Sequence, residues 1–115
     1  MTAYDPQALP PVIVAYLLAH QQEHDVETAV AAFAPAAVVT DVDTTHVGTA
    51  GIRDWIEQAA SEYAYTVAFT EQSQDAEGRW VVLNHLEGDF PGGVVDLRFR
   101  FTIVDGLIAR LDIQP

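Results

Sequence analysis

The segment VVDLRFRFTIVDGLIARLDI, Val94 to Ile113, alternates apolar and polar side chains on either side of an Asp-Gly pair. Alternation with a period of two is typical of a strand with one buried face, and Asp-Gly favours a tight hairpin turn. The segment therefore predicts two antiparallel strands joined by a hairpin. Their apolar faces must meet the core on the same side of the sheet.

The register of this hairpin can be predicted from its two faces. A two-residue turn at Asp105 and Gly106 would place Phe101 opposite Arg110 and mix apolar with charged side chains. A three-residue loop from Val104 to Gly106, with a left-handed glycine and a bulge, keeps one face apolar. The expected pairs are Ile103 with Leu107, Phe101 with Ala109, Phe99 with Leu111, Leu97 with Ile113 and, on the charged face, Arg98 with Asp112.

Further strand patterns precede this hairpin. The segments YTVAFTEQSQ (residues 65–74) and RWVVLNHLEGDF (79–90) alternate in the same way, and AEG and PGG supply turns between successive strands. Val38 to Asp41 predicts a short β-branched strand, followed by a polar connection to Gly48. The second half of the chain is therefore predicted to be an antiparallel meander.

Three helices are predicted before the meander, over residues 10–24, 25–34 and 49–63. Pro10 and Pro11 fit the first turn of the first helix, where a missing N–H costs little. Asp25 and Thr49 are the expected N-caps of the second and third helices, and Pro35 is expected to end the second. The expected buried stripes are Ile13, Tyr16, Leu17 and His20; Val26, Ala29, Val30 and Phe33; and Ile52, Trp55, Ile56, Ala59 and Tyr63.

Helices followed by a meander indicate an α+β domain. Each helix carries one apolar stripe, so a curved sheet wrapped around the helices would bury all three stripes. Such a sheet tends to enclose a cavity that is open at one end. With 115 residues the chain has room for one core, and we expect a single domain, residues 1–115.

The composition excludes several classes of function. Seventeen acidic residues face five arginines and no lysine, for a formal net charge of −12. Nucleic acids and anionic membranes are bound largely through cationic contacts to phosphate, so neither is an expected partner. Without cysteine, no disulfide or zinc–thiolate site can form. The N-terminus has no basic region, and the apolar run at 12–19 is too short to span a bilayer, so we expect a cytoplasmic protein.

Three segments resemble a known superfamily. HDVETAVAAFAPAAVVTD (24–41), HVGTAGIRDWI (46–56) and LEGDFPGGVVDLRFRFTIVDGLIARLDI (86–113) are similar to the nuclear-transport-factor-2-like superfamily, in its SnoaL-like branch. The resemblance runs from about Pro11 to the end of the chain. It implies a cone of mixed, largely antiparallel sheet, a cystatin-like α+β barrel, closed by three helices around an apolar pocket.

The resemblance also implies a homodimer formed through the outer face of the sheet, and the charged face of the last two strands suits such a contact. Members of the superfamily range from ketosteroid isomerase and polyketide cyclases to proteins with no catalytic role. The fold therefore fixes little about function.

Asp41 is the first candidate for a functional residue. In the resembling isomerase, a carboxylate that ends the strand after the second helix moves a proton alpha to a carbonyl, and Asp41 follows Phe33 at the matching spacing. A carboxylate half-buried among Val39, Trp55 and Phe99 is suited to proton abstraction. The alternative is that Asp41 only accepts backbone N–H groups in the following turn.

His46 and Tyr16 are candidates for the same site. His46 can form an acid–base pair with Asp41, or it can donate to a loop carbonyl at the pocket mouth. Tyr16 lies near the place of the isomerase's enolate-binding tyrosine, but a count back from Asp25 puts it one residue out of step. One residue rotates a helical side chain by about 100°, so core packing is the alternative for Tyr16. Asp43 is expected in an exposed loop.

The inner faces of the helices and strands supply candidates for the pocket wall. Asn84 is a polar residue on an apolar strand face and needs partners from a helix, a water or a ligand, and we favour a pocket role. When Phe99 to Phe101 is matched, the isomerase's second enolate-binding acid is replaced by Leu97, so the complete isomerase site is absent. The predicted lining residues are Asn84, Trp55, Tyr65, Phe90, Leu97 and Phe99.

No cofactor or metal is expected. His20 and His24 are spaced i, i+4 in HQQEH, but the order H-E-x-x-H and a third ligand are missing. PGG joins two strands and precedes no helix, so it is not a phosphate loop.

Two hypotheses for the function remain open. In the first, the protein binds a small hydrophobic, carbonyl-containing metabolite, and Asp41 is the general base of a cofactor-free isomerisation, cyclisation or dehydration. Tyr16, His46 or Asn84 would then donate to the developing oxyanion. In the second, the domain is a non-catalytic ligand-binding or dimerisation module whose pocket is filled by Trp55, Phe90, Phe99 and Phe101.

Overall fold

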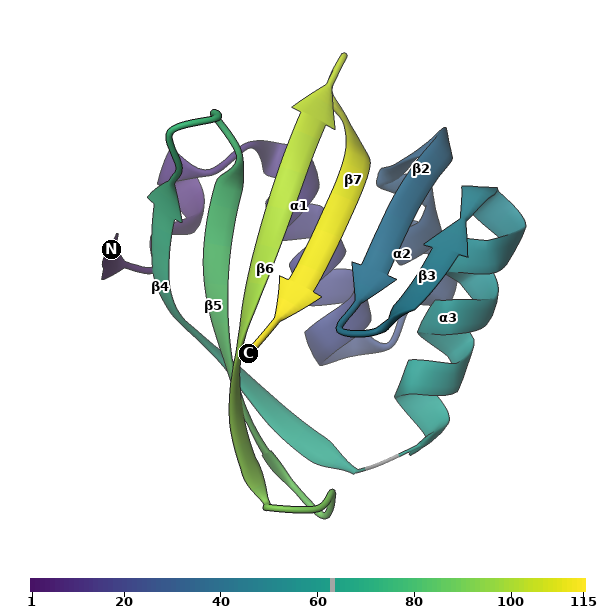
Figure 1. Cartoon of the computed structure of the whole chain (residues 1–115), viewed down its shortest axis with the longest axis vertical. Helices are drawn as coiled ribbons and strands as arrows, with labels where there is room; N and C mark the ends of the chain where they lie inside the picture. The colour runs from purple at the N-terminus through teal and green to yellow at the C-terminus, as the bar shows by residue number, and fades with distance from the viewer. Residues whose placement is uncertain (63) are drawn as a thin grey trace.

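The computed structural model describes residues 1–62 and 64–115, so Tyr63, which we predicted to be buried, lies outside the described residues. The strands are β1 (Thr2–Ala3), β2 (Phe33–Asp41), β3 (Thr44–Val47), β4 (Tyr65–Gln74), β5 (Trp80–Gly88), β6 (Val94–Val104) and β7 (Leu107–Gln114). In the described residues they form one sheet of order β1-β4-β5-β6-β7-β2-β3 (Figure 1). Among the described strands, only β2 and β7 pair in parallel. The sheet is mixed and largely antiparallel, as predicted, but it is not a closed barrel.

The helices are α1 (Pro11–Leu17), α2 (Val26–Ala31) and α3 (Gly48–Glu62), with a 3₁₀-helix, η1 (Pro6–Ala8), before α1 and a π-helix, η2 (Leu18–Glu23), directly after it. Figure 1 shows α1 and α2 behind the sheet and α3 beside β3. The predicted α+β architecture, with the helices first in the chain and the meander after them, is therefore confirmed. No helix in the described part of the chain is long and apolar enough to cross a membrane.

Local sequence signals account for the first two helices. Pro11 occupies the first turn of α1, and the predicted stripe of this helix is buried, with Ile13, Tyr16 and Leu17 fully inaccessible. Asp25 caps α2 by accepting the backbone N–H of Thr28 at 3.2 Å, as predicted. These side chains pack against the inner face of the sheet and form one core.

Three predicted boundaries were wrong. Strand β2 begins at Phe33 rather than Val38, because β7 pairs with it in parallel and Ile108 N–H donates to Ala32 O at 2.9 Å. Helix α2 ends at Ala31, so Pro35 does not end it but lies in the irregular stretch of β2, where its missing N–H removes no ladder bond that the register requires. Helix α3 starts at Gly48, one residue before the expected cap Thr49.

The polar connection that was predicted between Asp41 and Gly48 contains a strand, β3. It pairs antiparallel with β2, and Val39 lies opposite His46. The two-residue turn between the strands consists of Val42 and Asp43. Val42 has a φ of 57°, a left-handed conformation that is unusual for a β-branched residue. Asp43 is exposed, as expected.

The predicted register of the last hairpin was also wrong. Asp105 and Gly106 form a two-residue turn, and both have positive φ, 52° and 79°. The faces do not mix, because the register shifts beyond the turn and leaves Ala109 without a cross-strand partner. The observed pairs are Ile103 with Ile108, Phe101 with Leu111, Phe99 with Ile113, Arg100 with Asp112 and Arg98 with Gln114.

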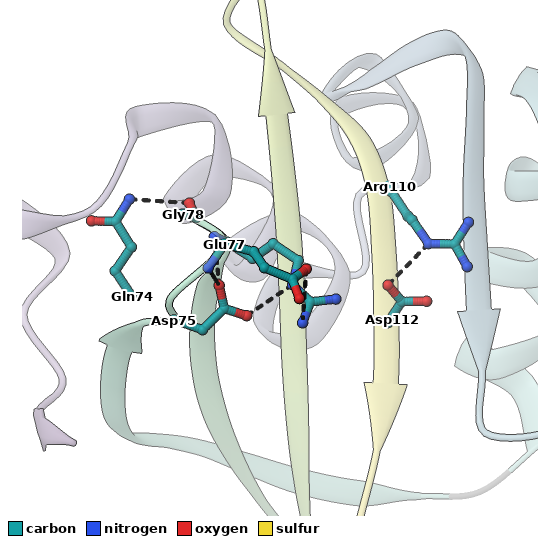
Figure 2. A network of polar contacts seen from close by, with 7 residues as sticks. Gln74, Asp75, Glu77, Gly78, Arg110 and Asp112 are labelled. Carbon is teal, nitrogen blue, oxygen red and sulfur yellow. Dashed lines mark hydrogen bonds and ion pairs between the residues drawn. The ribbon is translucent and has the colours of Figure 1, made fainter.

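The outer face of the sheet is polar. Arg110 Nε donates to Asp112 Oδ2 at 3.0 Å on β7, and Figure 2 shows this pair on the sheet surface beside the β4–β5 turn. In that turn, Asp75 accepts Arg79 Nε at 2.8 Å. On β5, His85 Nδ1 lies 2.7 Å from Asp96 Oδ1 of β6, and His85 Nε2 lies 3.0 Å from Glu87 Oε2. These two carboxylates raise the pKa of His85.

Candidate functional site

A cavity of about 280 Å³ lies between the helices and the inner face of the sheet. Its wall is formed by η2, the end of β2, α3 and the strands β4 to β7, so segments far apart in the sequence meet there. Most of the wall is apolar. The lining residues are His20, Gln21, Asp41, Trp55, Ala59, Tyr65, Leu86, Phe90, Val95, Leu97, Phe99 and Ile113.

Asp41 is fixed at the last position of β2. Its neighbour Val42 donates its N–H to Ile113 O at 2.9 Å, which ties the end of the hairpin to β7. The indole Nε1–H of Trp55 donates to Asp41 Oδ2 at 3.0 Å. This bond orients the half-buried carboxylate in the cavity wall and occupies one of its two oxygens.

His20 lies on η2 and is 3% exposed. Its Nδ1 is 2.7 Å from the hydroxyl of Tyr16, which is fully buried on the preceding turn. Burial lowers the pKa of His20 from 6.5 to about 4, and the nearby His24 adds to this effect. His20 is therefore a neutral imidazole at neutral pH, and within the described part of the chain its Nε2 has no hydrogen-bond partner.

Two tyrosines lie close to Asp41. Burial raises the pKa of Tyr16 well above its ordinary value of 10, and Tyr65 and Asp41 add to the rise, whereas a hydrogen bond from Gln21 lowers it. Burial and Asp41 also raise the pKa of Tyr65. Both hydroxyl groups therefore keep their protons at neutral pH and can act as hydrogen-bond donors.

The structure separates the predicted catalytic residues. Asp41 lines the cavity, but Tyr16 lies beneath the wall, where its ring also packs edge-on against Phe33 at 5.2 Å. His46 is not a lining residue. Its Nε2 lies 3.2 Å from Thr44 Oγ1, and its ring stacks on Trp55 at a centroid distance of 5.9 Å. Trp55, rather than His46, therefore holds the Asp41 carboxylate.

The predicted lining residues fall into two groups. Trp55, Tyr65, Phe90, Leu97 and Phe99 all belong to the cavity wall. In contrast, Asn84 is fully buried in the sheet but does not line the cavity. Its Nδ2 donates to Val82 O at 3.3 Å, and its Oδ1 has no hydrogen-bond partner in residues 1–62 and 64–115.

Two polar lining residues, His20 and Gln21, were not predicted. His20 was expected on the buried stripe of the first helix but without a role at a pocket, and no role was expected for Gln21. Gln21 is 8% exposed, and no described residue bonds to its Oε1. A buried glutamine beside a buried histidine does not fit one α-helical stripe, and the π-helix is what turns both side chains inward.

The arrangement provides one oriented carboxylate, neutral polar groups and apolar walls. Leu97 lines the cavity, whereas its neighbour Asp96 does not and instead lies 2.7 Å from His85 Nδ1. In the described part of the chain, no group of three or more histidine, aspartate or glutamate side chains is placed to hold a metal ion. The chemistry available from the wall is proton transfer and hydrogen bonding.

Comparisons with known proteins match this description. The SnoaL-like domain family matches residues 14–111. A predicted polyketide cyclase from Sinorhizobium meliloti is 34% identical, with a TM-score of 0.88 over 96% of this chain and 100% of its own. A comparison with curated proteins returned no match.

Two more distant structures share the fold. TerC, crystallised with polyporic acid, is 19% identical, with a TM-score of 0.75 over 90% of this chain and 88% of its own. Rv0760c from Mycobacterium tuberculosis, in complex with an estradiol hemisuccinate, is 17% identical, with a TM-score of 0.75 over 91% of each chain. On the family match and the 34% identity over nearly its full length, the chain belongs to the SnoaL-like domain family.

Proposed function

We propose that the protein binds a small, largely apolar carbonyl compound in the cavity and moves a proton on it, with Asp41 as general base. The observation that carries this proposal is the Asp41 carboxylate, which is oriented by Trp55 at 3.0 Å and lines an apolar cavity. The reaction class is a cofactor-free isomerisation, cyclisation or dehydration. A cytoplasmic location and a homodimer remain predictions that accompany it.

The proposed step uses groups that the cavity wall provides. The free oxygen of Asp41 takes a proton from the carbon alpha to the carbonyl, and the electrons of that C–H bond form the enolate. Negative charge then develops on the carbonyl oxygen. Tyr65 and His20 are neutral groups of the wall that can donate hydrogen bonds to it. In an isomerisation, the protonated Asp41 returns the proton to another carbon.

The size of the cavity limits the ligand. An apolar cavity of about 150 Å³ accommodates benzene, and the cavity here measures about 280 Å³. A two-ring skeleton is therefore a suitable probe. α-Tetralone has such a skeleton, one carbonyl and exchangeable protons alpha to it.

The test is exchange of deuterium into the alpha position of α-tetralone, followed by NMR. General base catalysis contributes about 10²–10⁴-fold, so Asp41→Asn is expected to lower the protein-catalysed exchange by at least about 100-fold. Asparagine keeps an oxygen that can accept the Trp55 N–H. Asp43→Asn is the matched control, since it makes the same change at the exposed neighbour in the same hairpin. Activity within about tenfold of wild type in Asp41→Asn would exclude the base role.

A ligand-binding role without catalysis is the second candidate. It is favoured by Leu97, because the cavity lacks the second acid that the resembling isomerase places there to hold its enolate. Saturable binding of α-tetralone together with exchange no faster than in buffer would support this role. The same result would exclude proton transfer on this probe.

A further inference from the structure

Two consecutive residues of the π-helix η2 line the cavity, and each carries one buried polar atom, His20 Nε2 and Gln21 Oε1. The proton-transfer step uses His20 only as one of two donors and gives Gln21 no role. Neither atom has a hydrogen-bond partner among the described residues, and both residues are more than nine-tenths buried. An unpaired buried polar atom is costly, so a pair of them in one cavity wall indicates that a ligand supplies the partners.

Tyr16 sets the hydrogen-bonding polarity of this pair. Gln21 Oε1 accepts no hydrogen bond from the described residues, which leaves His20 Nδ1 as the acceptor for the Tyr16 hydroxyl. The Tyr16 O–H therefore donates to His20 Nδ1, 2.7 Å away. A neutral imidazole that accepts at Nδ1 carries its proton on Nε2. The cavity therefore receives a donor from His20 and an acceptor from Gln21.

We propose that His20 and Gln21 form a two-point recognition site, which selects ligands that carry both a carbonyl acceptor and a hydroxyl donor. His20 Nε2–H binds the carbonyl oxygen, and Gln21 Oε1 accepts the hydroxyl. This inference rests on the proposed function, because it describes how the ligand of the same cavity is selected. Tyr16 is a positioning residue, which acts by fixing the tautomer of His20.

The test is a binding titration with one bicyclic skeleton that carries four combinations of groups. Tetralin has neither group, α-tetralone has only the acceptor, and tetrahydronaphthol has only the hydroxyl. The positional isomers of hydroxy-α-tetralone have both. Isothermal titration calorimetry at neutral pH is expected to show that at least one isomer binds about tenfold more tightly than α-tetralone, the gain from one well-placed hydrogen bond.

Two substitutions separate the two contacts. Gln21→Met keeps the length of the side chain and removes the acceptor, so it should abolish the preference for the hydroxyl while tetralin binding is kept. His20→Asn keeps an acceptor beside the Tyr16 hydroxyl but has no group at the place of Nε2, so it should abolish the preference for the carbonyl. Gln7→Met is the matched control, because Gln7 is exposed and lies on η1, outside the cavity wall.

A third substitution tests the role of Tyr16. Tyr16→Phe frees His20 to adopt either tautomer, so discrimination between α-tetralone and tetrahydronaphthol should decrease. If Tyr16 had only a structural role, Tyr16→Phe would weaken the binding of both probes equally, and this result would overturn the assignment of Tyr16 as a positioning residue.

The outcomes distinguish this inference from the proposed function. If tetralin and all its derivatives bind equally, or if Gln21→Met keeps the hydroxyl preference of the wild type, the recognition site is excluded while the cavity remains a binding site. If no member of the series binds, tetralin included, the proposed function is excluded, and the recognition site is excluded with it.

Discussion

The buried, neutral His20 predicts a specific pH dependence of stability. The change is His20→Asn, which removes the titrating ring but keeps an acceptor for the Tyr16 hydroxyl. Burial lowers the pKa of His20 from 6.5 to about 4 in the folded protein. Between these two values the unfolded chain binds a proton at His20 and the folded chain does not. The stability that His20 contributes is therefore fully present above the unfolded pKa and is lost as the pH falls from there towards about 4.

The magnitude follows from the difference between the two pKa values. One pKa unit corresponds to about 1.4 kcal/mol, so the full shift corresponds to about 3 kcal/mol of unfolding free energy. Between about pH 7 and about pH 5, linkage gives a loss of about 2 kcal/mol for wild type. His20→Asn lacks this contribution, and the other titrating groups are the same in both proteins.

The assay is urea unfolding of wild type and His20→Asn over the same pH range, followed by tryptophan fluorescence. The quantity of interest is the difference between the two unfolding free energies at each pH, in which the other groups cancel. His24→Asn is the matched control, because His24 is an exposed histidine at the end of the same π-helix. Parallel curves for wild type and His20→Asn would refute the reasoning, since His20 would then titrate in the folded state as it does in the unfolded one.

Three further predictions concern other parts of the fold. Val42→Gly is expected to raise the unfolding free energy by about 1 kcal/mol, because it relieves a left-handed β-branched residue whose side chain is exposed; urea unfolding measures it. Asn84→Leu should also raise the free energy of unfolding by about 1 kcal/mol, because it removes a buried oxygen that is unpaired within the described residues. A lower free energy of unfolding would show that this oxygen has a partner. Light scattering at micromolar concentration should give a dimer that Arg100→Glu weakens, and a wild-type monomer would contradict the outer-face interface.

The order of the elements was predictable, because the hydrophobic period of a segment is set by residues that are neighbours in the sequence. Period two after residue 64 and the apolar stripes before it required strands packed on helices, whatever the details of the turns. The last hairpin shows the limit of this reasoning. Alternation demanded one apolar face but allowed two solutions, a longer loop or a tight turn with a bulge. The chain uses Asp105 and Gly106 in a tight turn and shifts register at Ala109.

Strand β3 was missed for a different reason. Its sequence, TTHV, has little apolar character, and the strand lies at the edge of the sheet, where only one side needs a partner. Its position depends on β2, which in turn depends on parallel pairing with β7 from the other end of the chain. Such long-range pairing leaves no local pattern. The position of Asp41 was still predictable, because it depends only on where β2 ends.

The π-helix accounts for the missed lining residues. A count back from Asp25 that assumes α-helical geometry misplaces every side chain before the wider turn. LAHQQE contains no glycine or proline that would signal this turn. Its contacts are tertiary, since Gln22 Nε2 donates to Val67 O of β4 at 2.9 Å. The wider turn brings His20 and Gln21 inward together, so the helix irregularity and the two unpaired cavity atoms have one cause.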